Sequence, residues 1–131
     1  MFLNKYAGYI YLFTAITSTV ISQLITKWRV TNHIAAWFPM PEGMLAKLWF
    51  IIRILTDPFI IIACFLTLAG GILWIATMTK FDISYAYPFT MLGFVAVLIL
   101  SALLLGEQFN IYKIIGCCII ITGVFVTSKG L

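Results

Sequence analysis

Long apolar runs divide the chain, and four of them have the length of a membrane-spanning helix. They cover residues 6–27, 58–78, 84–105 and 110–128. A helix crosses the hydrocarbon core of a bilayer with about 20 mostly apolar residues, and these runs lack the two-residue alternation of a transmembrane β-strand. The pattern predicts an all-α fold, an integral-membrane four-helix bundle, in a single transmembrane domain of residues 1–131.

Local signals at the ends of these runs agree with this division. Asp57 precedes Pro58, which places a capping carboxylate before a proline at the first helical position. Gly106 follows the third run, and Asn110 stands where it can cap the fourth. We therefore expect helices to begin close to Pro58 and Asn110 and one helix to end at Gly106.

The longest polar interruption lies between the first two runs, and residues 43–56 within it predict an additional amphipathic helix. The apolar residues on one side of that helix are Leu45, Leu48, Ile52 and Leu55. Lys47 and Arg53 lie away from this stripe, and Trp49 lies at its edge. The pattern is typical of an interfacial helix in the head-group layer, with basic side chains directed outward. A segment that simply caps the bundle fits equally well.

Composition supports a membrane protein and excludes several other classes. The chain is 63% apolar and 9% charged, with a mean hydropathy of +1.12, whereas a soluble domain is roughly 45–50% apolar and about 25% charged. A soluble enzyme, a disordered tail and a nucleic-acid-binding domain are therefore excluded. The net charge of +4 indicates membrane lipids with anionic head groups as partners, and no nucleic acid.

The basic residues do not decide the orientation of the chain in the membrane. Lys5, Lys80 and Lys129 lie on the side of the two termini, and the other five basic residues lie on the opposite side. Cytoplasmic loops are usually the more basic ones. The count of basic residues therefore mildly favours an orientation in which both termini face away from the cytoplasm. Insertion in both directions and anions bound by the first loop remain alternatives.

Polar residues inside the first span are the most informative functional signal, because polar groups in a bilayer usually face a cavity, a partner helix or a substrate path. One stripe, repeating every four residues, is formed by Thr14, Ser18 and Ser22. A neighbouring stripe is formed by Thr19, Gln23 and Lys27. Serine and threonine often serve only as contacts between helices, but an amide and an ammonium on one face favour an anionic ligand such as phosphate.

The sequence carries no constellation of catalytic residues. Its acidic residues lie outside the middle of the spans, with Glu107 next to the third, and its single histidine, His33, lies in the first loop. The cysteines Cys64, Cys117 and Cys118 match no metal or disulfide spacing and are expected to be small buried apolar residues. We therefore expect no enzyme, no metal site and no cofactor.

Short motifs in the second half of the chain resemble a known transporter group. They are Leu73-Trp74-Ile75, the run from Asp82 to Pro88, Leu105-Gly106-Glu107, and the glycines Gly116 and Gly123. Together they resemble the drug/metabolite transporter superfamily, which includes the small multidrug resistance exporters and the EamA-like proteins. Gln23, followed four residues later by Lys27, is similar to the first helix of the aminoarabinose-phosphoundecaprenol flippase subunits.

This resemblance implies a small multidrug resistance-like bundle in the bacterial inner membrane that works as a homodimer or as a heterodimer with a similar subunit. The implied substrate is a polyprenyl-phosphate lipid that carries a sugar. Lys27, with Arg29 as a second cation, would hold the phosphate. The residues that would line the sugar path are Gln23, Ser22, Ser18 and Thr14, with Trp74 and Tyr87 as its walls.

Two other functions fit parts of the sequence. A proton-coupled exporter of organic cations needs a titrating carboxylate, and Glu107 would have to supply it, because Thr19 stands where multidrug exporters carry a glutamate in the first helix. A non-transporting subunit that scaffolds a glycosyltransferase or a flippase complex is the second alternative.

Overall fold

The computed structural model describes residues 2–130 of the chain, and side chains over residues 6–130. All regular secondary structure in this part of the chain is helical, as the apolar pattern predicts. The elements in order are α1 (Phe2–Asn32), the short 3-10 helix η1 (Ile34–Trp37), α2 (Met44–Leu55), α3 (Pro58–Met78), α4 (Ile83–Leu105) and α5 (Ile111–Ser128). Within it, α1, α3, α4 and α5 are each long and apolar enough to cross a membrane.

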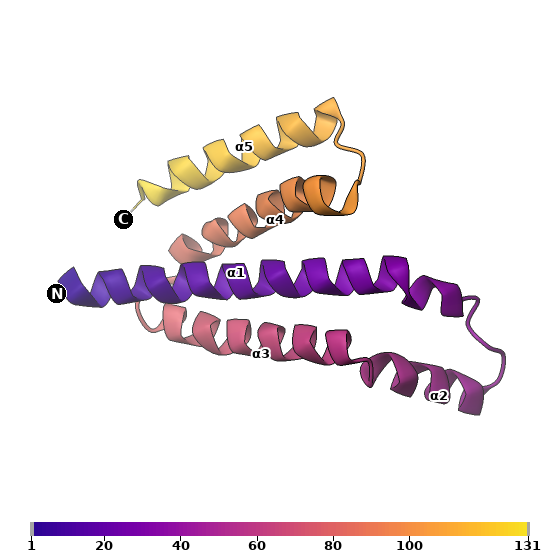
Figure 1. The fold of residues 1–131 in the computed structure, drawn as a ribbon. Helices are drawn as coiled ribbons and strands as arrows, with labels where there is room; N and C mark the ends of the chain where they lie inside the picture. Colours follow the sequence, from indigo (N-terminus) through magenta and orange to yellow (C-terminus); the bar gives the residue numbers. More distant parts are fainter. Residues whose placement is uncertain (1, 131) are drawn as a thin grey trace.

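The first helix lies at the centre of the bundle. Figure 1 shows α1 between α3 and α4, with α5 on the far side of α4. The chain termini and the α3–α4 turn gather at one end of the bundle, which we call the terminal end. The α4–α5 connection, η1 and α2 gather at the other end, which we call the loop end. Helices α3 and α4 make little contact with each other, because α3 packs chiefly against α1, and α4 packs against α1 and α5.

The predicted helix boundaries are confirmed where capping groups set them. The Asp57 carboxylate accepts hydrogen bonds from the amides of Phe59 at 3.1 Å and Ile60 at 3.4 Å, and Pro58 occupies the first turn of α3. The side chain of Asn110 accepts from the amide of Lys113 at 3.1 Å at the start of α5. Gly106 ends α4 with a φ of 67°, a left-handed conformation that glycine adopts without strain.

Helix α1 continues past the predicted span of 6–27 to Asn32. Its last turns are held against the start of α3, where the Arg29 guanidinium pairs with Asp57 and the Trp28 ring packs 5.3 Å from the ring of Phe59. These contacts stabilise helical turns that are too polar to be recognised as part of an apolar run.

The three cysteines occupy different environments. Cys117 is buried, as expected, whereas Cys64 and Cys118 lie on the surface of their helices. The expectation of burial is wrong for these two residues, because a spanning helix also carries apolar side chains on the side that faces lipid.

Candidate functional site

A half-open cavity of about 440 Å³ lies between α1, α3 and α4. Its walls combine apolar side chains and glycines with five residues that carry hydrogen-bonding groups. These are Thr19 and Gln23 from α1, Thr67 and Trp74 from α3, and Thr90 from α4. None of the described residues that line it is acidic. The described lining carries no charged residue, so the cavity suits a neutral polar group and offers no carboxylate to a cation.

The threonine hydroxyls of the cavity already donate to their own helices. Thr19 donates to the carbonyl of Ala15 at 3.0 Å, and Thr90 donates to the carbonyl of Tyr87 at 2.6 Å. Each hydroxyl oxygen keeps lone pairs as acceptors. These groups are therefore suited to accept hydrogen bonds from hydroxyl or amino groups of a ligand, such as those of a sugar.

The two polar stripes of α1 face different neighbours. Ser22 is buried against α3, where its hydroxyl donates to the carbonyl of Ala63 at 2.7 Å and lies 2.7 Å from the hydroxyl of Thr67. Ser18, one turn earlier, is half-buried, and Thr14 is exposed. In the second stripe, Thr19 and Gln23 line the cavity. The structure thus places Ser22 in a helix contact and Gln23 in the cavity.

Gly70 allows the close approach of α3 to α1 beside the cavity. A Cβ atom at this position would lie 3.2 Å from the carbonyl oxygen of Ala15 and 3.1 Å from Thr19 Oγ1. Gly71, which follows, also lines the cavity, but a Cβ there would meet open space. A side chain at Gly70 would therefore press against α1, whereas one at Gly71 would not.

The two aromatic residues predicted as walls lie together. The ring of Trp74 on α3 and the ring of Tyr87 on α4 meet edge to face, with centroids 6.1 Å apart. Trp74 contributes to the cavity wall, whereas Tyr87 is largely exposed. The pair bridges α3 and α4, two helices that have little other contact.

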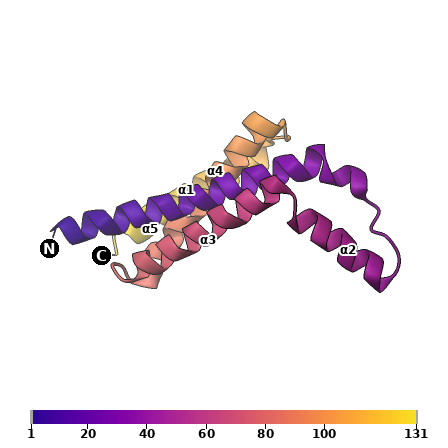
Figure 2. The same cartoon turned by 60° about the horizontal axis from the view of Figure 1, so that its bottom comes forward.

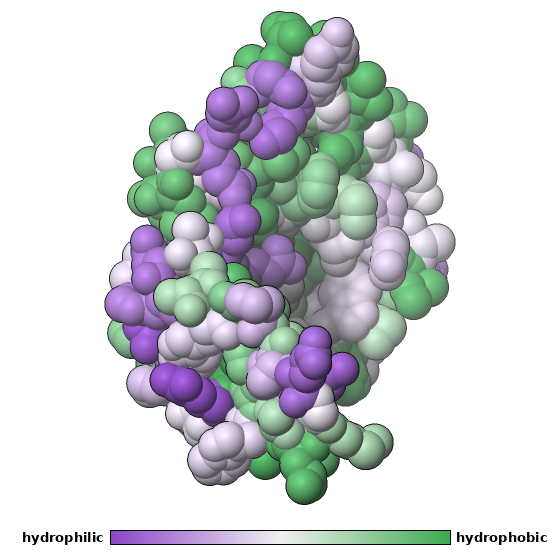
Figure 3. All heavy atoms as spheres, turned by 90° about the vertical axis from the view of Figure 1, so that its right-hand side faces the viewer, coloured by the Kyte–Doolittle hydropathy of each residue, from purple (hydrophilic) through white to green (hydrophobic). Residues whose placement is uncertain are grey.

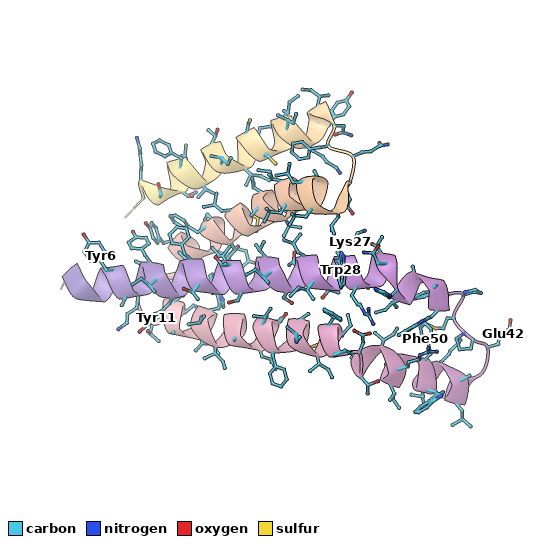
Figure 4. The ribbon with its side chains drawn as sticks, viewed as in Figure 1. Tyr6, Tyr11, Lys27, Trp28, Glu42 and Phe50 are labelled. Atoms are coloured by element: carbon cyan, nitrogen blue, oxygen red, sulfur yellow. The ribbon has the colours of Figure 1, made fainter. Side chains whose placement is uncertain are left out.

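Both predicted cations lie toward the loop end, and each is paired with an acidic residue. The Lys27 ammonium lies 3.0 Å from a carboxylate oxygen of Glu107, with the two side chains 52% and 36% exposed. Figure 4 places Lys27 near the end of α1, away from Tyr6 at the terminal end. Hydrogen bonding from Lys27 lowers the pKa of Glu107, which keeps this carboxylate ionised at neutral pH. Lys27 lies one turn beyond Gln23, so it stands next to the cavity without lining it.

The ion pair of Arg29 is more buried than that of Lys27. Its Nε and Nη2 atoms donate to Asp57 Oδ2 at 2.9 and 2.8 Å, and the two side chains are only 17% and 4% exposed. The hydrogen bonds from Arg29 hold the pKa of Asp57 below its usual value, although burial opposes that shift. The same carboxylate caps α3, so this ion pair joins the end of α1 to the start of α3.

Aromatic packing fills the terminal end of the bundle. The hydroxyls of Tyr9 and Tyr85 are hydrogen bonded at 2.8 Å, and the ring of Phe81 packs 4.8 Å from that of Tyr9 and 5.4 Å from that of Tyr85. Gly8 leaves room for Phe81, because a Cβ there would lie 2.7 Å from its ring. The bundle is therefore packed with rings at one end and carries ion pairs at the other.

Figure 3 shows the loop end of the molecule, where hydrophilic side chains line the left side and the lower edge of a recess whose other side is pale to hydrophobic. The charged pairs of α1 belong to this end. Among the described residues, no group of three or more His, Cys, Asp or Glu side chains could hold a metal ion.

The sequence pattern identified two lining residues, Gln23 and Trp74. It placed Thr19 on the same stripe as Gln23 without assigning it to the site, and it missed Thr67 and Thr90. Both threonines are polar residues inside apolar runs, and this is the signal that could have marked them. Their convergence on one cavity depends on how three helices pack, which the sequence pattern does not contain.

Comparison with known proteins relates the sequence of this chain to transporters. The model of the EamA-like transporter family matches residues 5–129. A protein of Photorhabdus laumondii subsp. laumondii, named as a probable 4-amino-4-deoxy-L-arabinose-phosphoundecaprenol flippase subunit ArnF, is 30% identical over 129 residues. The match covers 93% of this chain and 97% of that protein. No solved structure matches the chain.

Proposed function

Because the chain belongs to the EamA-like transporter family, we propose that this multi-pass membrane protein moves a polyprenyl-phosphate-linked sugar, or a related anionic lipid, across the bacterial inner membrane. The observation that carries the proposal is the acid-free cavity lined by threonines, an amide and a tryptophan, with the ammonium of Lys27 one turn away. The name of the relative from Photorhabdus, a flippase subunit for a polyprenyl-linked aminosugar, supports the choice of substrate class.

The cavity suits a sugar better than a whole lipid. Its volume of about 440 Å³ lies within the range of small-ligand pockets, so it holds a head group and leaves the polyprenyl chain in the bilayer. The acceptor oxygens of Thr19 and Thr90 would bind sugar hydroxyls or an amine, and the Gln23 amide can donate as well as accept. Trp74 offers a ring face for the sugar to stack on.

In this proposal Lys27 holds the phosphate. Its partner Glu107 is itself a half-exposed carboxylate, and a phosphate oxygen offers the ammonium the same kind of charge-assisted hydrogen bond. When the lipid enters, its phosphate would replace Glu107 as the partner of Lys27. The free-energy cost would be small, because an exposed ion pair contributes little to stability. The sugar would then extend along Gln23 into the cavity.

Arg29 has a different part in the proposal. Its guanidinium is held by the buried Asp57 carboxylate, so a phosphate could engage it only by leaving a buried charge unpaired, which is costly. We propose that Arg29 positions the end of α1, and thereby Lys27, instead of serving as the main phosphate ligand. Ser22 and Ser18 would shape the path through packing, and exposed Thr14 would offer a hydroxyl beyond the cavity.

A second subunit would complete the path. The cavity is partly open, and the described residues contain four spanning helices. Transporters commonly place their substrate between two repeats or subunits. We propose a homodimer or a heterodimer with a similar chain. The alternative of a proton-coupled cation exporter is less well supported, because Glu107 lies outside the cavity and its lowered pKa opposes proton uptake near neutral pH.

The proposal is tested by lipid translocation in proteoliposomes. The protein is purified from its native membrane in mild detergent, so that a partner chain is retained, and is reconstituted with 4-amino-4-deoxy-L-arabinose-phosphoundecaprenol. A membrane-impermeant amine reagent then labels only head groups in the outer leaflet. We expect protein-dependent exchange between leaflets, and we expect Lys27→Ala to abolish it while Lys27→Arg retains it.

The matched control is Lys113→Ala, which removes a lysine at the same end whose ammonium donates to the carbonyl of Gln108 at 2.7 Å. This variant should translocate at the wild-type rate. Wild-type rates equal to those of empty vesicles would contradict the proposed function. Full activity in Lys27→Ala would contradict the phosphate role of Lys27 alone.

A further inference from the structure

Helix α2 presents three chemically distinct faces. Phe50 is buried, 7% exposed, and its ring packs 5.2 Å from the ring of Phe38 in the preceding segment. Lys47 and Arg53 are placed three residues before and after Phe50, about 60° to either side of it on a helix. The opposite side carries an exposed apolar face formed by Leu45, Leu48, Trp49, Ile52 and Leu55.

This apolar face has no covering element among the described residues. Leu45 is 83% exposed and Trp49 is 71% exposed, and the contact of α2 with α3 is slight. Phe50 faces the other way, onto the segment that precedes α2. The helix is therefore amphipathic in an unusual sense, because its buried side faces its own chain and its larger apolar side faces outward.

The length of α3 indicates where α2 lies relative to the membrane surface. The 21 residues of α3 span about 31 Å at 1.5 Å per residue, which matches the roughly 30 Å hydrocarbon core of a bilayer. Pro58 therefore lies at a membrane surface, and α2 ends three residues before it, at Leu55. Figure 2 shows α2 turning away from the axis of α3 at this point, so it does not prolong the spanning helix.

We propose that α2 lies in the plane of the membrane on the loop-end side, with its apolar face among the acyl chains and Lys47 and Arg53 at the phosphates of anionic lipids. The charges agree with this partner, because α2 contains two cations and no acidic residue. The cations flank the side opposite the apolar face, so they reach upward to the head groups when that face is immersed. Trp49, at the edge of the apolar face, is a residue type that favours this depth.

Arg53 and Lys47 differ in how freely they reach lipid. The Arg53 guanidinium stacks 4.2 Å above the ring of Trp37, which fixes its position beside the buried face. Lys47 makes no ion pair with another described side chain. We therefore expect Lys47 to supply most of the preference for anionic lipid and Arg53 to hold the segment before α2 at the surface.

The proposal is tested by the depth of Trp49 in vesicles. The full chain is reconstituted in phosphatidylcholine and phosphatidylglycerol, and the difference in emission between wild type and Trp49→Phe isolates this tryptophan from the other three. Lipids brominated near the carbonyl end of the acyl chain should quench this difference signal about two-fold more than lipids brominated near the methyl end. Aqueous acrylamide should quench it weakly.

The lipid preference is tested in the same vesicles. Brominated phosphatidylglycerol should quench Trp49 roughly two- to five-fold more than an equal fraction of brominated phosphatidylcholine. The double substitution Lys47→Gln/Arg53→Gln should remove this difference and leave the depth unchanged. The matched control is Lys113→Gln, a lysine at the same end outside α2, which should retain the preference.

Other occupants of the apolar face give other results. Strong quenching by acrylamide with none by brominated lipid would show α2 in water, and absence of both would show it covered by another protein chain. Either result overturns the proposal, as does equal quenching by the two brominated lipids. The measurement does not depend on translocation, so its failure is distinguishable from failure of the proposed function.

Discussion

Arg29 and Asp57 form a two-pronged ion pair in which Nε and Nη2 lie 2.9 and 2.8 Å from the same carboxylate oxygen, Oδ2. The pair joins residues 28 positions apart in the chain, and its carboxylate also caps α3. The pair thus fixes how the end of α1 is placed against the start of α3. Lys27 lies two residues before Arg29, in the same part of α1. The position of the proposed phosphate ligand depends on this junction.

Removing the carboxylate should therefore destabilise the protein. Asp57→Ala leaves the Arg29 guanidinium without its buried partner and removes the cap of α3, so we expect a loss of about 3 kcal/mol. Denaturation in mixed micelles, followed by loss of helicity, measures this change. The matched control is Asp82→Ala, because Asp82 precedes α4 but its side chain makes no capping hydrogen bond, and it should change stability by less than about 0.5 kcal/mol. Equal effects of the two substitutions would contradict the role of the ion pair.

The same pair predicts a pH dependence. Hydrogen bonds from Arg29 lower the pKa of Asp57 in the folded protein, so the stabilisation is present above the ordinary carboxyl pKa and is lost as pH falls through the folded-state value. The stability advantage of wild type over Asp57→Asn should be constant above about pH 5 and should shrink below about pH 4. Thermal midpoints of both proteins across this range test the sign. An advantage that grows on acidification would contradict it.

Two adjacent glycines should respond differently to a methyl group. Gly70→Ala brings a Cβ within 3.2 Å of the Ala15 carbonyl oxygen, and overpacking against backbone costs about 1–3 kcal/mol. Gly71→Ala places its methyl in open space and should be neutral, or stabilising by up to about 1 kcal/mol through helix propensity. The thermal midpoints of the two variants give the comparison. A larger loss in Gly71→Ala would show that α1 and α3 do not pack as described.

Glu107→Gln separates the two transport mechanisms. If Lys27 receives a phosphate, removing the competing carboxylate should raise the apparent affinity for the polyprenyl-phosphate lipid roughly two- to five-fold. A proton-coupled cation exporter would instead lose transport of a quaternary ammonium dye. The matched control is Glu42→Gln, an exposed carboxylate also at the loop end (Figure 4), which should leave the affinity unchanged.

Hydroxyl groups in the cavity should matter for transport more than for folding. Thr90→Val preserves shape but removes the acceptor oxygen, and loss of one hydrogen bond to the sugar should lower the translocation rate about ten-fold. Thr122→Val on α5 removes a hydroxyl that likewise donates to its own helix, at 2.8 Å from the carbonyl of Cys118, and should have no effect on the rate. Equal rates for both variants in the proteoliposome assay would contradict a sugar path along Thr90.

The sequence by itself determined the four spanning helices and the amphipathic helix α2, although not the last turns of α1 or η1, because hydrophobicity and capping act locally. Runs of about 20 apolar residues mark spanning helices, and Asp57, Gly106 and Asn110 end or begin helices through contacts with their own neighbours. The amphipathic segment before Asp57 was likewise visible as a helix from its pattern alone.

Tertiary structure alone decided what each polar residue of α1 does. Ser22 and Gln23 are adjacent in the chain, yet one is buried against the carbonyl of Ala63 and the other faces a cavity. Neighbouring helix positions point about 100° apart, and only the placement of α3 and α4 determines which direction meets a helix and which meets open space. For the same reason, the ion pairs of Lys27 and Arg29 with distant carboxylates could not be read from residue spacing, because nothing local brings those partners together.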